Sequence, residues 1–278
     1  MDYIKKKRTI IVSVYSAILL LILLGIYACV KPKPSCFDGQ KNQNEENIDC
    51  GGVCVKKCEI ELKENIAVMN AGAVESGIAG QYDIYGQVEN PNSFYGSNKF
   101  SYTFQIKDAG GTVMAEKKGI NYILPRETKY IVVSNINLPR APASVGMVVE
   151  ETEWVEFQND YFERPQLNVV NKNYQEIAGG VGFAEATGLL KNESPFDFNK
   201  INLEVILKDG SGRIVALNST KMDTVRSKEN RDFRAVWPNR FSGTVANMEV
   251  QVEVNVFDSE SFVKRFFKTQ DFQRYDME

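Results

Sequence analysis

Hydrophobic and polar residues alternate with a period of two along much of the chain beyond residue 58. Three clear runs lie at residues 100–106 (FSYTFQI), 201–207 (INLEVIL) and 250–256 (VQVEVNV). Because successive side chains of a strand point to opposite faces of a sheet, this period predicts strands with one buried face. No segment after the N-terminal apolar run has a clear helical period, so the sequence predicts an all-β region.

The two halves of this β region resemble each other. Residues 85–113 align with residues 187–215 at an offset of 101 or 102, pairing Gly86 with Gly188, Asn90 with Asn192, Asp108 with Asp209, and Gly111 with Gly212. The first glycine predicts a bulge or a close backbone approach, the asparagine a turn, and the Asp-Gly segment a hairpin. A repeat of about 100 residues has the size of one β-sandwich. We therefore predict two tandem sandwiches, at residues 59–163 and 164–278.

The repeated pattern consists of G-x-(V/L)-x-N, a long alternating strand, and then D-x-x-G-x-(V/I). It resembles the FxLYD domain and the related water-stress and hypersensitive-response domain of late-embryogenesis-abundant proteins. This resemblance implies immunoglobulin-like β-sandwiches that serve as binding or structural modules, without a cofactor or conserved chemistry.

An uncharged apolar run occupies residues 9–30 (TIIVSVYSAILLLILLGIYACV). About 20 such residues suffice to cross a bilayer as a helix. The basic segment at residues 5–8 predicts a cytoplasmic tail at 1–8 and an extracytoplasmic chain after the helix. A cleaved secretory signal is an alternative. Another is a lipoprotein, because Cys29 ends a segment similar to a lipobox.

Four cysteines follow the apolar run within the predicted module at residues 31–58. They are Cys36, Cys50, Cys54 and Cys58. An even cluster in a short extracytoplasmic segment predicts two structural disulfides, and three connectivities are possible. A zinc site is an alternative, although paired C-x-x-C motifs are absent from the sequence. The segment also resembles a module of microbial surface proteins with the pattern C-x-D-G-x-x-N-x-x-E-x-x-x-D-C-G-G-x-C-x-x-x-C.

Four polar side chains in this module are candidate calcium ligands. They are Asp38, Asn42, Glu45 and Asp49. Their hard oxygen atoms and the neighbouring glycines suit calcium. Capping and Asx-turn hydrogen bonds explain the same residues without an ion, and the spacing lacks the full EF-hand pattern.

Charge and composition exclude several classes of function. The chain has no histidine, which removes the commonest general base. Four cations and one acid precede the apolar run, so 29 basic and 35 acidic residues remain beyond it, a net charge of −6. Such a region lacks the basic surface that nucleic acids require. The acids around Trp154, at residues 150–156, suggest at most a weak hydrolase alternative, and we predict no catalytic residues.

Aromatic residues in two corresponding segments are candidate partner-binding residues. They are Phe94, Tyr95, Phe196 and Phe198. Loop aromatics can form a recognition edge, but they can equally close the end of a sandwich. The sequence thus predicts a non-catalytic, single-pass cell-envelope protein. Its β domains would make protein–protein or surface contacts with unidentified partners, for example as a subunit or assembly factor of an envelope complex. A surface adhesin that binds carbohydrate or another cell is the alternative.

Overall fold

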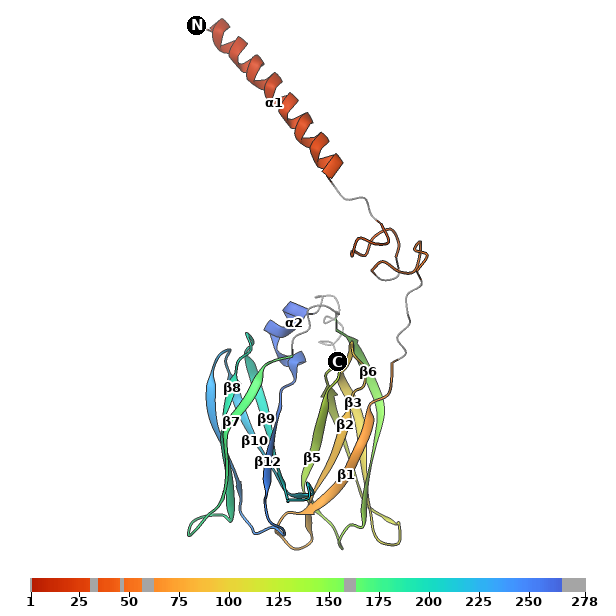
Figure 1. Cartoon of the computed structure of the whole chain (residues 1–278), viewed down its shortest axis with the longest axis vertical. Coiled ribbons are helices and arrows are strands. Elements are labelled where there is room, and N and C mark those ends of the chain that lie inside the picture. The colour runs from red at the N-terminus through yellow and green to blue at the C-terminus, as the bar shows by residue number, and fades with distance from the viewer. Residues whose placement is uncertain (1, 31–34, 46–47, 57–62, 158–163, 267–278) are drawn as a thin grey trace. The chain divides into compact units, whose positions relative to one another are not determined.

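The computed structural model describes residues 2–30, 35–45, 48–56, 63–157 and 164–266. Within the N-terminal helix it describes the side chains of residues 6–9 and 12–23. The chain divides into two compact units, residues 1–62 and 63–278 (Figure 1). We describe each unit separately.

The first unit contains the helix α1, Asp2–Val30. The predicted helix is therefore present, and it includes the basic segment that we expected to form a separate tail. In the part of the chain that the structure describes, no helix has both the length and the hydropathy that crossing a bilayer requires. The transmembrane part of the prediction is thus not supported.

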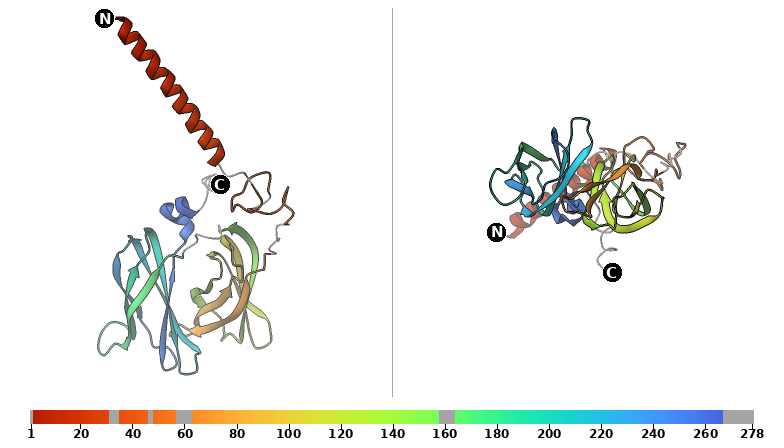
Figure 2. Two further views of the ribbon diagram at one scale, coloured as in Figure 1. Left: turned by 45° about the horizontal axis from the view of Figure 1, so that its top comes forward. Right: turned by 90° about the horizontal axis from the view of Figure 1, so that it is seen from below.

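The second unit consists of four three-stranded antiparallel sheets, arranged as two sandwiches (Figures 1 and 2). In the first sandwich the sheet order β1-β2-β5 faces the sheet order β4-β3-β6. Its strands are β1 Ala67–Glu75, β2 Gln81–Glu89, β3 Tyr95–Lys107, β4 Val113–Ile123, β5 Thr128–Asn137 and β6 Ser144–Glu156. The second sandwich repeats this topology as β7-β8-β11 and β10-β9-β12. Its strands are β7 Leu167–Glu176, β8 Ala184–Asn192, β9 Phe198–Lys208, β10 Ile214–Val225, β11 Asn230–Trp237 and β12 Asn247–Glu253.

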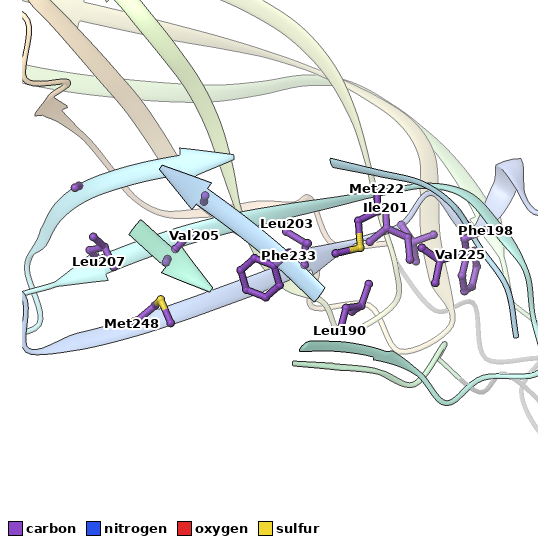
Figure 3. Packing of buried hydrophobic residues seen from close by; sticks show 14 of the residues in the cluster. Leu190, Phe198, Ile201, Leu203, Val205, Leu207, Met222, Val225, Phe233 and Met248 are labelled. Carbon is purple, nitrogen blue, oxygen red and sulfur yellow. The ribbon is translucent and has the colours of Figure 1, made fainter. Parts of the chain in front are cut away.

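Each sandwich has its own hydrophobic core, formed by the inward-facing residues of its two sheets. In the first core, Phe100, Phe104 and Ile106 of β3 are fully buried. In the second, alternate residues of β9 pack against β8, β10, β11 and β12 (Figure 3). The predicted all-β class is confirmed for the two sandwiches. The exact boundary at 163/164 stays a prediction, because residues 158–163 lie outside the described segments.

In both copies, side chains pack directly against the repeated glycine. A Cβ atom on Gly86 would lie 2.9 Å from Phe104 Cε1, and one on Gly188 would lie 2.6 Å from Phe233 Cε1. These distances are too short for any side chain, so an aromatic ring occupies the space in both copies. The predicted hairpin turns are also present, with Gly111 and Gly212 at φ of 80° and 85°.

The end of the chain differs from the sequence prediction. We expected one strand through residues 250–256, but β12 ends at Glu253 and is followed by a 3₁₀ turn, Val256–Asp258, and the helix α2, Glu260–Phe266. The Asn255 side chain accepts a hydrogen bond from the Phe257 N–H and so caps the turn. α2 then buries Phe262 against Phe196, with ring centroids 5.0 Å apart. Tertiary packing thus stabilises a helix that is too short to show a period.

Candidate functional site between the two sandwiches

The two sandwiches meet through apolar side chains that point away from both cores. Ile206, Ile214 and Leu217 of the second sandwich pack against Val74 and Tyr130 of the first. All five are buried, and Ile206 is 0% exposed. β9 is therefore buried on both faces, which explains why Ile206 interrupts the alternation of hydrophobic and polar residues. We call the region of these contacts the inter-sandwich interface.

A glutamine side chain pairs with the edge of the first sandwich. Gln251 of β12 accepts a hydrogen bond from the Tyr130 N–H at 2.6 Å and donates one to the Tyr130 carbonyl at 2.9 Å. β5 is an edge strand, and Figure 1 shows it on the side of its sandwich that faces β12. The amide thus satisfies backbone groups that would otherwise offer a pairing edge to another chain.

Aromatic residues extend the interface toward the end of the second sandwich that carries α2. Phe157, which follows β6, lies 5.8 Å from Phe257 in an edge-to-face arrangement. Phe157 and Leu124 are buried together with residues of the second core. The contact between the sandwiches therefore involves more than the central patch.

The internal repeat shows that this apolar pattern is specific to the two faces that meet. The sheet registers place Tyr130 and Asp232 at equivalent positions, and likewise Ile206 and Gln105. Leu217 pairs with Ile206, whereas its counterpart Glu116 pairs with Gln105. Each sandwich therefore has an apolar outer face at the contact, and the equivalent positions of the other sandwich carry polar residues. The two faces are unlike, so this contact is heterologous, and polar counterparts oppose its continuation to further copies.

A group of buried charges lies beside the apolar patch. The Lys129 ammonium is 2% exposed, 2.8 Å from Asn121 Oδ1, 3.7 Å from a Glu253 carboxylate oxygen and 3.8 Å from the centre of the Tyr122 ring. Glu204 projects from β9 and accepts a hydrogen bond from Ser219 Oγ at 3.0 Å. Its second oxygen is buried without a hydrogen-bond partner among the described residues. The positive charge of Lys129 thus compensates the charges of two carboxylates of the second sandwich, Glu253 and Glu204.

Burial raises the pKa of Glu204 to about 7, and the nearby negative charge of Glu253 adds to the rise. The Ser219 hydroxyl and the Lys129 charge oppose it. The folded protein therefore binds a proton at Glu204 more tightly than the unfolded chain, whose reference pKa is 4.5. Stability from this group is fully present below about pH 4.5 and decreases as the pH rises to about 7.

We expect Glu204→Gln to raise the free energy of unfolding by about 2 to 3 kcal/mol at pH 8, because one pKa unit corresponds to about 1.4 kcal/mol. At pH 4 the variant should match the wild type, since Glu204 is then protonated in both states. Urea unfolding across this range measures the difference. A constant difference at every pH would contradict the role of ionisation, and Glu176→Gln, at an exposed position of β7, serves as the control.

The disulfide prediction for the cysteine module is confirmed at Cys36 and Cys54, which form a disulfide with each other. Cys50 is also disulfide-bonded. Cys58 lies outside the described residues, and the side chain of Cys29 within α1 does as well. Ligand atoms of Cys36, Glu45 and Cys54 lie within 4.8 Å of one another. The two bonded sulfurs offer no thiolate, which is the form of cysteine that binds zinc.

The candidate calcium ligands form hydrogen bonds within the module. Asp49 accepts from the N–H groups of Asp38 and Gly39, at 3.0 and 2.9 Å. Asp38 accepts from Ser35 N–H and Asn42 Nδ2, each at 2.9 Å, and these bonds lower its pKa. Glu45 accepts from the Asn42 N–H at 3.2 Å and is buried. These contacts are the turn-forming bonds of the ion-free alternative, and calcium binding stays a prediction.

The structure separates the four candidate aromatic residues by their burial. Phe196 and Phe198 are 4% and 1% exposed and belong to the second core. Phe94 and Tyr95 are half-buried, and the Lys63 ammonium lies 4.7 Å from the centre of the Tyr95 ring. The closing of a sandwich end accounts for Phe196 and Phe198. A binding role for the four residues stays a prediction.

The acids around Trp154 all lie on β6, where two of them have local partners. Glu150 accepts a hydrogen bond from Thr103 Oγ1 at 2.8 Å, and Glu153 lies 3.3 Å from the Lys99 ammonium. These contacts account for Glu150 and Glu153 as residues of a sheet surface.

Sequence reasoning missed the inter-sandwich interface, although a signal for it exists. Ile206 is apolar at a position where the strand period requires a polar residue, and its repeat counterpart Gln105 is polar. Comparison of the repeats position by position could have identified this face. The contributions of Lys129 and Glu253 carry no comparable signal, because lysine and glutamate are usually solvated.

Comparison with known proteins adds no family assignment. No protein-family model matches the chain, and no curated protein matches it. A crystal structure of red sea bream transglutaminase is similar over 70% of this chain and 29% of that one, with 10% sequence identity and a TM-score of 0.23. At this TM-score the similarity carries no argument about function.

Proposed function

We propose that this chain is a non-catalytic cell-envelope protein whose two β-sandwiches form one rigid arm for contacts with other proteins. The observation that carries this proposal is the inter-sandwich interface. Outward apolar residues and a buried charge group join two domains that each have a complete core. Tandem domains with small polar interfaces move relative to each other, whereas a large apolar contact opposes such motion.

In this proposal the two sandwiches belong to the immunoglobulin-like group, and the FxLYD-like pattern of the repeat supports that assignment. Such sandwiches commonly act as recognition or spacer modules, and their loops and outer faces carry the contacts. The cysteine module is a compact spacer between the arm and the N-terminal helix. Its Cys36–Cys54 bond supports a stiff structure in an oxidising compartment.

Membrane attachment through residues 9–30, with the arm outside the cell, is part of the proposal. It rests on the apolar run and on the basic segment before it. No helix among the described residues has the length and hydropathy that crossing a bilayer requires, and attachment is therefore tested by itself. Carbonate extraction of native membranes should leave the chain in the membrane pellet. Protease added to intact cells should cleave the chain beyond residue 31. Release of the whole chain by carbonate contradicts the attachment.

If the two sandwiches form one rigid arm, partner contact depends on their fixed relative orientation and not on one sandwich alone. We expect the double variant Ile206→Gln and Leu217→Glu to lose about 2 to 3 kcal/mol of interface stability while both cores remain folded. The new side chains are those found at the equivalent positions of the first sandwich, Gln105 and Glu116. The matched control is Gln105→Ile, which makes the reverse change on an outer polar face.

The measurement combines spin-label distances between the two sandwiches with photo-cross-linking from Ile120, an exposed residue of β4. The wild type and the control should give one narrow distance and one defined cross-linked protein in native cells. The double variant should give a broad distance and a weaker cross-link. An unchanged cross-link in a loosened arm, or turnover of a substrate by the purified protein, would exclude the proposed function.

A further inference from the structure

A polar cavity of about 310 Å³ lies between the two sandwiches, next to the apolar patch. The first sandwich contributes Asp83 of β2 and Ser134 and Asn135 of β5. The second contributes Asn218 and Ser219 of β10 and Asn239 after β11. Cavities of this size accept small ligands. The polar lining groups are a carboxylate, hydroxyls and amides, and apolar residues such as Leu217 and Trp237 complete the lining. Both sandwiches are needed to form the cavity.

The carboxylate of this cavity is buried without a compensating cation. Asp83 is 7% exposed. Its carboxylate accepts a hydrogen bond from the Asn135 N–H at 2.8 Å, and no salt bridge to it occurs among the described residues. Burial raises the pKa of Asp83, and the bond from Asn135 only partly opposes the rise. A buried carboxylate of this kind favours a cationic partner.

The internal repeat provides a reference for this position. The equivalent residue of the second sandwich is Glu185, which pairs with Gln175 as Asp83 pairs with Val74. Glu185 has a cation of its own, because Arg234 donates to it at 2.6 Å. The counterpart of Arg234 in the first sandwich is Val132, an apolar residue. The first copy therefore has the carboxylate without the arginine, and this carboxylate lines a cavity.

We propose that this cavity is a binding site for a small organic cation that carries a primary ammonium group beside hydroxyl groups. Asp83 would accept the ammonium group in a charge-assisted hydrogen bond, the interaction that replaces the missing arginine. The hydroxyl and amide side chains around it would bind the ligand hydroxyls. A single carboxylate suits an ammonium better than calcium, which takes six to eight oxygen ligands and usually several carboxylates.

The test uses glucosamine as the probe and glucose as its neutral analogue, with the complete two-sandwich chain. We expect glucosamine to bind with a Kd of about 1 mM or tighter near pH 6.5, where its amine carries a proton, and glucose to bind at least about tenfold more weakly. In the wild type, amide NMR signals of Ser134 and Asn135 should shift on titration. Asp83→Asn should weaken binding at least about tenfold, because it removes the charge and keeps the acceptor for the Asn135 N–H.

The matched control is Glu185→Gln, which changes the equivalent residue of the other sandwich and should leave glucosamine binding unchanged. Thermal unfolding verifies that Asp83→Asn is folded, and the wild-type NMR titration remains decisive if it is not. The proposal is overturned if glucose and glucosamine bind alike or if only calcium chloride shifts the signals. Absence of any shift with glucosamine overturns it as well.

Discussion

Lys129→Met should lower the free energy of unfolding by about 3 to 5 kcal/mol at pH 8, the usual cost of leaving buried charges without their partner. The Lys129 ammonium is 2% exposed and lies 3.7 Å from Glu253, and its positive charge lowers the pKa of Glu204. Methionine fills a similar volume but supplies no charge and no donor to Asn121. The two carboxylates of the second sandwich would then repel each other in a buried region.

The pH dependence of this loss identifies its cause. At low pH, protonation of Glu204 removes one of the two charges, so the loss should become smaller. The double variant Lys129→Met/Glu204→Gln should have a higher free energy of unfolding than the sum of the two single changes predicts. The reason is that one of the charges that Lys129 compensates is already absent. Urea unfolding of the four proteins at pH 5 and pH 8 measures the coupling. Equal losses at both pH values would indicate a packing role for Lys129 instead.

Asn192→Ala should destabilise the second sandwich by about 3 to 5 kcal/mol, since several buried polar groups lose their partners together. Asn192 is 1% exposed. Its Nδ2 donates to the carbonyls of Phe196 and Arg226 at 2.8 and 2.9 Å, and its Oδ1 accepts from the Ser194 N–H at 3.1 Å. One side chain thus joins two chain segments that follow different strands.

The variant Asn192→Asp distinguishes the contribution of the N–H donors to stability from the contribution of the side-chain volume. It keeps the acceptor oxygen and the shape but removes both N–H donors, so it should be about as destabilising as alanine at neutral pH. Asn230→Ala, at an exposed position of β11, should change stability by no more than about 0.5 kcal/mol. Chemical denaturation of the three variants provides the comparison. Wild-type stability in Asn192→Asp would exclude the donor role.

The same arrangement occurs in the first sandwich, which shows why the repeat retains an asparagine. Asn90 is 0% exposed and donates to the carbonyls of Tyr95 and Leu124 at 2.7 and 2.9 Å. The sequence predicts a turn at both positions, and the structure adds that the side chain fixes a second, distant segment. Turn propensity is local and can be inferred from the chain, whereas the partner carbonyl 34 residues away cannot.

The inter-sandwich interface and the cavity beside it both lie where the two copies of the repeat differ. Ile206 and Leu217 are apolar where Gln105 and Glu116 are polar, and the counterpart of Arg234, which pairs with Glu185, is Val132 in the copy that contains Asp83. These differences are concentrated on the two faces that meet. Rigid joining and ligand binding would therefore use the same pair of surfaces, and Asp83→Asn tests ligand binding without changing Ile206 or Leu217 of the interface.

The sequence by itself determined the local features of this protein: the strand period, the positions of the hairpin turns, the N-terminal helix, the two-fold repeat and the disulfide-bonded module. Each depends on residues close together in the chain, or on a pattern that recurs. Only the tertiary structure decided that Ile206 meets Tyr130 and that Lys129 lies beside Glu253. It also decided that Phe262 stabilises a helix of seven residues. A strand's period identifies which residues share a face, but the identity of the surface that covers this face depends on packing between segments that lie far apart in the chain.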